Sequence, residues 1–273
     1  MIQEVGDIAA SGGAAQFGVP ALAAHGLVKR FGGLAAVDGI DLSIAPGEIV
    51  GLVGRNGAGK TTLLRLLCGL LQPTVGSIVV SGFDMTRAPL EARRLLGYLD
   101  EEPLVYEHLS GREFVDLLAD LYGVPRDEAR ATRVRQLLRL VDLESRQHDL
   151  ISGYSHGMRG KIGLVSLLLH RPRLLLLDEP TNGLDPPSAR RIKDLLVELA
   201  AQGTAVVLST HILDIAQALC TRLLVIDRGH IVAAGSMDSL RSQAGRAGAT
   251  LEQVFLDLTG SGEERDIIAE LVR

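Results

Sequence analysis

The sequence predicts an α/β fold in which helices cover a mainly parallel sheet. Three observations lead to this fold class. After residue 170, short apolar stretches of strand character alternate with amphipathic helical patterns, which is typical of parallel sheets. Near the N-terminus, two strand-like stretches flank a glycine turn and predict an antiparallel β subdomain. Between about residues 97 and 170, strand signals are absent and apolar residues recur three and four apart, so we expect an inserted α-helical subdomain.

Glycine and proline turns separate the N-terminal elements. Leu22–Phe31 and Ala36–Ile44 have strand composition, and the Gly32-Gly33 turn between them predicts a hairpin. Pro46-Gly47 turns the chain again before the short apolar strand Glu48–Val53. The strands expected further on are Ser77–Val80, Leu174–Leu177, Thr204–Ser209 and Leu223–Asp227, and the helices are Lys60–Leu70, Gly111–Tyr122, Asp127–Val141, Arg159–Leu169 and Pro187–Ala200.

Composition limits the classes of function. Of the 273 residues 47% are hydrophobic and 22% charged, which excludes a disordered chain. A net charge of −5 gives no basic footprint, so we expect no nucleic-acid partner. The first residues lack the basic start and dense apolar stretch of a secretory signal, and the longest apolar region, residues 163–177, is interrupted by His170, Arg171 and Arg173. We therefore expect a soluble cytoplasmic protein, and nothing in this composition prevents it from docking on a membrane protein.

A glycine-rich segment follows the strand Glu48–Val53 and opens the next helix. Gly54–Thr61 has the spacing Gly, four residues, Gly-Lys-Thr, which lets backbone N–H groups curl around phosphates at the positive end of a helix. Lys60 supplies a charge to the outer phosphates, and the Thr61 hydroxyl is suited to Mg²⁺. We call Gly54–Thr61 the phosphate loop; it predicts a P-loop NTPase core. The nucleotide-binding residues expected here are Gly54, Arg55, Asn56, Gly57, Ala58, Gly59, Lys60, Thr61 and Thr62.

Two acids end the apolar strand Leu174–Leu177. Asp178 and Glu179 lie where ligands bind in parallel sheets, at the carboxyl edge. Asp178 is expected to hold Mg²⁺, and Glu179 to orient and help deprotonate the attacking water. The alternative is that both acids merely end a strand at the solvated edge.

A third segment, Tyr154-Ser155-His156-Gly157-Met158, precedes a long helical run. Ser155 is suited to cap this helix, and with Gly157 it forms another helix start able to hold an anion. An ordinary capped helix is the alternative interpretation.

These segments, with Gly183-Leu184-Asp185 and His211, occur in the order and approximate spacing of the ABC ATPases, which the chain resembles over residues 22 to 240. The resemblance identifies Tyr154–Met158 as the signature segment, whose Ser155 and Gly157 contact the γ-phosphate held by a second subunit. It places Leu184 and Asp185 at the dimer seam, His211 at the γ-phosphate, and Phe31 against adenine. The alternatives are a loop histidine for His211, a core residue for Phe31 and a helix cap for Asp185.

The chain departs from the family pattern at two positions. ABC ATPases usually have a Gln that senses Mg²⁺ and water where the loop enters the helical insertion. Glu101 stands there in this chain, and a solvated acidic loop is the alternative to a metal-sensing role. His156 replaces a commoner glycine in the signature segment, a change that spares the second and fourth residues.

The resemblance also implies a domain plan and a function. We expect a flexible tail (1–21), an ABC ATPase domain (22–240, with core 22–97 and 170–240 and helical insertion 98–169) and a C-terminal helical extension (241–273). Leu251–Gly260 resembles the tail of bacterial drug and antibiotic exporter ATPases, with simple packing onto the core as the alternative.

By this resemblance the chain is an ATPase subunit that uses ATP and Mg²⁺. It would drive export through a separate multi-span membrane permease, by ATP-driven dimerisation with a second ATPase subunit, in the simplest case a second copy. The catalytic residues implied are Glu179, His211 and Lys60. The alternative functions are a soluble ABC ATPase that works without a membrane partner and a nucleotide-switch regulator.

Overall fold

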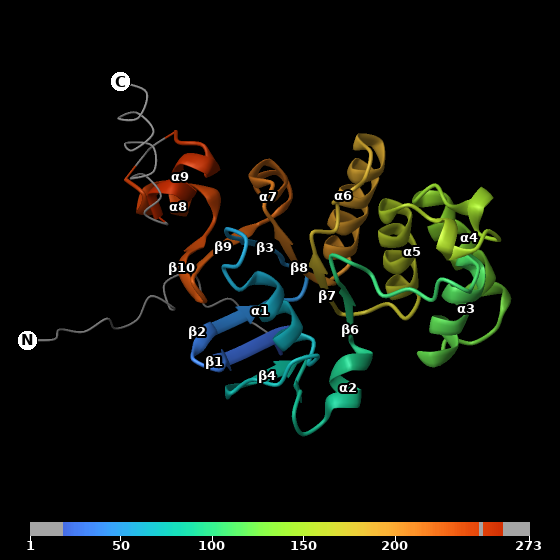
Figure 1. The fold of residues 1–273 in the computed structure, drawn as a ribbon, viewed down its shortest axis with the longest axis horizontal. Helices are drawn as coiled ribbons and strands as arrows, with labels where there is room; N and C mark the ends of the chain where they lie inside the picture. Colours follow the sequence, from blue (N-terminus) through green and yellow to red (C-terminus); the bar gives the residue numbers. More distant parts are fainter. Residues whose placement is uncertain (1–18, 246–247, 259–273) are drawn as a thin grey trace, which may run out of the picture.

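The computed structural model describes residues 19–245 and 248–258 and contains two sheets (Figure 1). A four-stranded antiparallel sheet has the order β2-β1-β4-β5, and a six-stranded sheet has the order β10-β9-β3-β8-β7-β6. The predicted fold class, a mainly parallel α/β core with an antiparallel β subdomain and inserted helices, is confirmed. In Figure 1 the antiparallel sheet lies below α1 (Lys60–Leu67), and the inserted helices gather at the far right end of the molecule.

The six-stranded sheet is parallel except at one edge. Neighbouring strands from β9 to β6 run in parallel, while β10 pairs with β9 in the antiparallel sense. Every residue of β3, β7 and β8 is buried, which is expected of central strands covered on both faces. The strands are β3 (Ile49–Val53), β6 (Leu96–Leu99), β7 (Leu174–Asp178), β8 (Ala205–Thr210), β9 (Arg222–Asp227) and β10 (His230–Gly235).

The sequence did not predict β6 and β10. Strand signals were expected to end at about residue 97, yet Tyr98 and Leu99 pair with Leu176 and Leu177 of β7 inside the core sheet. β6 has only four residues. A run this short is too short to show whether its apolar residues follow the period of a strand or that of a helix. Helix α1 also ends three residues earlier than predicted, because Gly69 takes a left-handed conformation (φ 74°) directly after the C-cap Cys68.

The antiparallel sheet contains the predicted hairpin. β1 (Leu22–Phe31) pairs with β2 (Leu34–Ile44) across the Gly32-Gly33 turn, and β2 begins two residues earlier than expected. β4 (Val75–Val80) pairs with the other edge of β1, and the two-residue β5 (Phe83–Asp84) completes the sheet.

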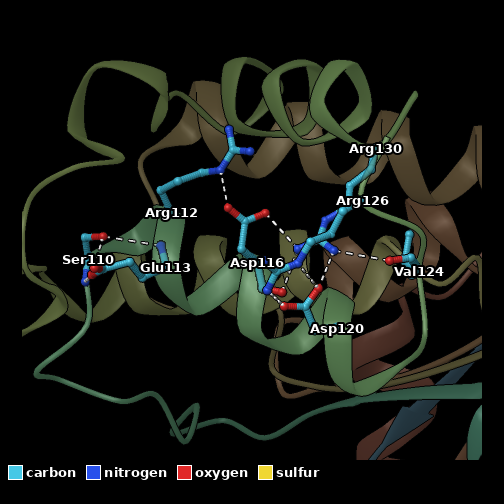
Figure 2. Close-up of polar contacts among 8 residues, drawn as sticks. All are labelled: Ser110, Arg112, Glu113, Asp116, Asp120, Val124, Arg126 and Arg130. Atoms are coloured by element: carbon cyan, nitrogen blue, oxygen red, sulfur yellow. Dashed lines mark hydrogen bonds and ion pairs between the residues drawn. The ribbon is translucent and has the colours of Figure 1, made fainter. Parts of the chain in front are cut away.

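Side-chain caps fix the starts of the inserted helices. Ser110 forms a capping box with Glu113 at α3 (Gly111–Leu121), shown on the left of Figure 2. Asp127 caps α4 (Glu128–Leu140), and α5 (His156–Leu168) packs against both α3 and β6. The remaining α-helices are α2 (Pro89–Arg94), α6 (Pro186–Ala201), α7 (Leu213–Leu219), α8 (Met237–Gln243) and α9 (Leu251–Leu258).

A buried arginine joins α3 to α4. The Arg130 side chain is 4% exposed and donates to Asp116 Oδ1 (2.9 Å) and Asp120 Oδ1 (2.6 Å), as Figure 2 shows. Arg112 also donates to Asp116, and the exposed Arg126 donates to Asp120. Hydrogen bonds from Arg126 and Arg130 hold the pKa of Asp120 well below its usual range. At neutral pH the α3–α4 pair is therefore held by charged hydrogen bonds as well as by apolar contacts.

We expect Arg130→Met to lower the free energy of unfolding by about 2–3 kcal/mol in urea denaturation. Removing one partner of a buried ion pair commonly costs ~3–5 kcal/mol, because the other partner stays buried without compensation. Here the two carboxylates keep 34% and 31% exposure, so water offsets part of that cost. Arg126→Met is the matched control: it removes an arginine from Asp120 that is 78% exposed, and we expect stability close to that of the unchanged chain. Equal losses in both variants would contradict the role of Arg130.

Parts of three sequence predictions fall outside the described residues. These parts are 1–18 of the expected tail, 246–247 and 259–273 of the C-terminal extension, and Thr259-Gly260 of the exporter-like motif. The division of the chain into core, insertion and extension stays a prediction. Within residues 19–245 and 248–258, none of the helices combines the length and apolar composition that a bilayer crossing requires.

Candidate nucleotide site

The phosphate loop connects β3 to α1 and is packed tightly on both sides. Gly59 has φ 109°, and a Cβ there would lie 2.4 Å from the carbonyl oxygen of Ala36. A Cβ on Gly54 would lie 2.5 Å from the carbonyl oxygen of Ile226. Glycine is therefore required at both positions, because the backbone has no room for a side chain. The loop keeps its N–H groups at the start of α1, as an anion site needs.

Lys60 lies at the centre of the site. It is 8% exposed, and its Nζ donates to the carbonyl oxygens of Gly54 (2.8 Å) and Arg55 (3.2 Å). Burial lowers its pKa, while the charges of Glu179, Asp178 and Glu101 oppose that shift. The ammonium group is thus held inside the loop with predicted site acids around it. Thr61 and Thr62 follow in the first turn of α1 and are half-buried.

Asp178 is the last residue of β7, and one oxygen of its buried carboxylate has no hydrogen-bond partner in the described structure. It is 2% exposed, and its Oδ1 accepts a hydrogen bond from the Ser209 hydroxyl on β8. Its Oδ2 is buried and has no hydrogen-bond partner in the described structure. A buried carboxylate oxygen without a partner is costly unless a ligand satisfies it, and Mg²⁺ or its bound water is suited to do so. The residues present therefore fit a magnesium ion.

Glu179 is held in a strained conformation beside His211. Its φ is 47°, a left-handed value that costs a non-glycine residue ~1–3 kcal/mol and is concentrated at functional sites. Its Oε1 accepts from the backbone N–H of His211 (2.9 Å) and lies 2.8 Å from His211 Nδ1. Only 7% of the Glu179 side chain is exposed, against 55% for His211. The alternative of two acids at a solvated edge is therefore wrong.

The signature segment lies against the loop that contains Leu184 and Asp185. Ser155 caps α5 by accepting from the N–H of Met158 (3.3 Å), which confirms the predicted cap. A Cβ on Gly157 would lie 2.5 Å from the carbonyl oxygen of Gly183, so the two backbones are in close contact. Ser155 and His156 are exposed, while Tyr154 is buried and donates from its hydroxyl to the carbonyl of Arg146 (2.8 Å).

Asp185 has a local structural task of its own. It caps α6, accepting from the N–H of Ser188 (2.9 Å) and from the Ser188 hydroxyl (2.7 Å). These two hydrogen bonds lower the pKa of its carboxyl group. The helix-cap interpretation is thus correct, and the place of Leu184 and Asp185 at a dimer seam stays a prediction.

Phe31 lies at the end of β1, and Glu101 lies close enough to Lys60 for its charge to act on it. Phe31 ends β1 with 49% exposure, and Lys29 Nζ lies 5.2 Å from its ring centre, so the core alternative for Phe31 is wrong. Glu101 follows β6, is exposed, and accepts from the side-chain amide of Asn182 (3.3 Å). This hydrogen bond joins the end of β6 to the loop after β7. Because Glu101 is exposed, the alternative of a solvated acidic loop stays open.

Sequence reasoning missed Ser209 and Asn182. Ser209 is fully buried, donates to Asp178 and accepts from the N–H of Glu179 (3.2 Å), so it fixes both acids. The signal was a small polar residue at the end of the apolar strand before His211. Asn182, one residue before Gly183, gave no pattern of its own. Of the predicted catalytic and metal-binding residues, the structure brings four close together: Lys60, Asp178, Glu179 and His211.

Comparison with known proteins shows the family of the chain. Residues 37–182 match the family model described as ABC transporter. An uncharacterized ABC transporter ATP-binding protein of Bacillus subtilis is 40% identical over 219 residues, which are 80% of this chain and 70% of that protein. The daunorubicin resistance ATP-binding protein DrrA3 of Streptomyces coeruleorubidus is 39% identical over 82% of this chain and 71% of its own length.

Solved structures give the same result. A structure described as the ATP-binding subunit of an ABC transporter superposes with a TM-score of 0.82 at 33% identity, covering 87% of this chain and 98% of that one. A cassette described as a dimer after hydrolysis, bound to ADP and phosphate, shares the fold with a TM-score of 0.73 at 24% identity, over 79% of this chain and 98% of its own. This chain therefore belongs to the ABC transporter family, as one of its ATP-binding, ATP-hydrolysing subunits.

Proposed function

We propose that two copies of this subunit hold two ATP molecules between them and so power export through a separate membrane permease. One observation carries the proposal: the chain has two helix starts suited to hold an anion, and they belong to different elements of the fold. The phosphate loop lies at the end of β3, and the signature segment lies at the start of α5 against Gly183. In the described chain, the only hydrogen bond of the Ser155 side chain is with its own helix. A second subunit is what would bring Ser155 to a phosphate.

Within one site, each residue has a distinct task in ATP hydrolysis. Lys60 and the phosphate-loop N–H groups bind the phosphates, and the Thr61 hydroxyl and Asp178 would hold Mg²⁺, with Glu101 near them. The metal, when bound, neutralises charge on the phosphates. Nowhere in the described part of the chain do three His, Cys, Asp or Glu side chains form a metal site, so phosphate oxygens and water would complete the ligands. Glu179 accepts the proton of the attacking water, and His211 positions Glu179 and the γ-phosphate.

Export is supported by relatives and by the surface of the chain. Among the relatives are a daunorubicin resistance ATP-binding protein and a probable multidrug transporter ATP-binding protein of Escherichia coli, the latter 32% identical over 88% of this chain and 42% of its own length. The segment between β6 and α3 exposes Leu104 (94%) and Tyr106 (60%) beside the inserted helices. Exposed apolar side chains of this size are typical of protein contacts. We propose that a permease binds here and keeps the subunit at the cytoplasmic membrane face.

Replacing Leu104 by Asp tests the docking part of the proposal. We expect the variant to lose co-purification with a multi-span permease that binds the unchanged subunit, because a charge would enter an apolar contact. ATP hydrolysis by the free subunit should stay within about twofold, since the Leu104 side chain is 94% exposed. Leu90→Asp, on α2 with 68% exposure, is the matched control and should keep the complex. Loss of the complex in the control, or its survival in Leu104→Asp, would refute this surface.

Replacing Phe31 by Ala tests the adenine site. Stacking of a base on an aromatic ring is worth ~1–3 kcal/mol, so we expect the Kd for ATP to rise about tenfold, measured by calorimetry. The fold should be little affected, because the ring is half exposed. Phe31→Tyr keeps the aromatic face and should bind ATP like the unchanged chain. An unchanged Kd in Phe31→Ala would remove Phe31 from the site.

A further inference from the structure

A large cavity lies at the edge of the core sheet opposite the nucleotide site. Its volume is about 710 Å³, within the ~300–1,000 Å³ typical of small-molecule sites. Part of its lining comes from the residues directly before two strands: Arg171, Pro172 and Arg173 before β7, and Gly203-Thr204 before β8. Asp178 and His211 stand at the other ends of the same two strands. Five strand residues separate the two sites by roughly 17 Å, so the cavity is no part of the nucleotide site.

Three arginines and no carboxylate line this cavity, which we call the arginine cavity. Arg133 reaches it from α4, and Arg171 and Arg173 from the segment between α5 and β7. This is unusual in a chain that has 33 acidic and 28 basic residues. Arginines elsewhere in the described structure, such as Arg130 and Arg222, lie against carboxylates. Within the described residues, none of the three cavity arginines has an acidic side chain within ion-pair distance.

Hydrogen bonds hold the guanidinium group of Arg133 in place, but no acidic side chain of the described residues balances its positive charge. Its Nε and Nη2 donate to the carbonyl oxygen of Leu168 at the end of α5 (3.3 and 2.7 Å), so its Nη1 group remains available for a ligand. Burial lowers the pKa of Arg133, and the positive charge of Arg171 lowers it further. An anion between these two arginines would remove that repulsion and supply the missing counter-charge.

Arg171 is kept at a position where its backbone is strained. Its φ is 53°, a left-handed conformation that glycine or asparagine adopts at less cost. The residue turns the chain from α5 into β7, a task for which glycine would be better suited. A charged side chain at a position where its backbone conformation costs stability points to a use for the charge.

The rest of the wall is partly apolar and partly polar. Ala21, Leu168, Leu199 and Pro172 contribute apolar area, and Ser81, Gln202 and Thr204 contribute polar groups. An inorganic ion would leave this apolar area uncovered, while a compound with an apolar part would bury it. Arginine guanidinium groups match phosphate oxygens in pairs of hydrogen bonds. We propose that the arginine cavity is a second ligand site, which binds a small organic phosphate independently of ATP.

The test uses the full chain with Lys60→Ala, so that anion binding at the phosphate loop is weakened, and phenyl phosphate as the probe, titrated by calorimetry without Mg²⁺. We expect saturable binding about tenfold tighter than that of inorganic phosphate, because only phenyl phosphate covers the apolar wall. Adding Arg171→Gly and Arg173→Gln should raise the Kd for phenyl phosphate roughly a hundredfold, a factor of about ten for each lost arginine. Arg171→Gly relieves the backbone strain, so we expect this substitution to leave the fold intact, and thermal unfolding of the combined variant checks that it is folded.

The matched control removes the same two charges elsewhere, by Arg87→Gln and Arg94→Gln at exposed positions in and before α2. This pair should leave the Kd within about twofold, since exposed charges at a distance are screened. Three results would each overturn the proposal. They are the absence of saturable binding, equal weakening in both pairs of variants, and equal affinity for inorganic phosphate and phenyl phosphate.

Discussion

Replacing Glu179 by glutamine is expected to slow ATP hydrolysis about a thousandfold while ATP binding is retained. A positioned general base accounts for roughly 10²–10⁴ of a rate, and glutamine cannot accept the proton. The site itself should survive, because the amide oxygen of glutamine can accept the hydrogen bond from the His211 N–H in place of Oε1. Phosphate release gives the rate, and calorimetry gives the affinity for ATP.

The same variant tests the two-subunit site. If ATP joins two copies and hydrolysis separates them, Glu179→Gln should accumulate as a dimer under saturating Mg-ATP, seen by light scattering on a sizing column. Glu198→Gln removes a carboxylate from the exposed face of α6 and is the matched control for rate and assembly. A Glu179→Gln protein that binds Mg-ATP but remains monomeric would refute the ATP-driven dimer, whatever its rate.

Most of the nucleotide site could be predicted because its geometry is local. The phosphate loop needs one strand, one turn and one helix start in direct succession, and glycine is required at Gly54 and Gly59 by contacts with the neighbouring β2 and β9. Asp178 and Glu179 follow an apolar strand without interruption, so their place at the sheet edge follows from the strand itself. The helix cap that Ser155 forms could be predicted for the same reason, because its partner Met158 lies three residues further along the chain.

The parts that sequence reasoning missed depend on partners far along the chain. β6 is a strand because it pairs in parallel with Leu174–Leu177, and β10 is a strand because it pairs with β9 in the antiparallel sense. The four residues of β6 and the six of β10 do not reveal these partners. Ser209 joins Asp178 across two strands that are about thirty residues apart in sequence. The arginines of the cavity come from α4 and from the segment between α5 and β7, and only the packed fold brings them to one wall. No local pattern contains such pairings.

Replacing Ser155 by Asp separates the local task of this residue from its proposed task between subunits. Aspartate caps a helix as well as serine does, so the fold and the start of α5 should be kept. The new charge, however, would lie where the second subunit is proposed to present its γ-phosphate. Two like charges about 4 Å apart cost roughly 4 kcal/mol near a protein surface, so we expect ATP turnover to fall at least a hundredfold.

The affinity of the isolated subunit for ATP should not change, because its own phosphate loop is untouched. Calorimetry at a protein concentration too low for dimers measures this, and a phosphate-release assay measures turnover. Ser236→Asp is the matched control, since Ser236 is also an exposed serine that caps a helix, α8, by accepting from the N–H of Ser239 (3.3 Å). Turnover in Ser155→Asp equal to that of the control would mean that Ser155 only caps α5. Weaker ATP binding by the lone Ser155→Asp subunit would mean that Ser155 serves the phosphate site of its own chain, so that no second copy is needed to complete it.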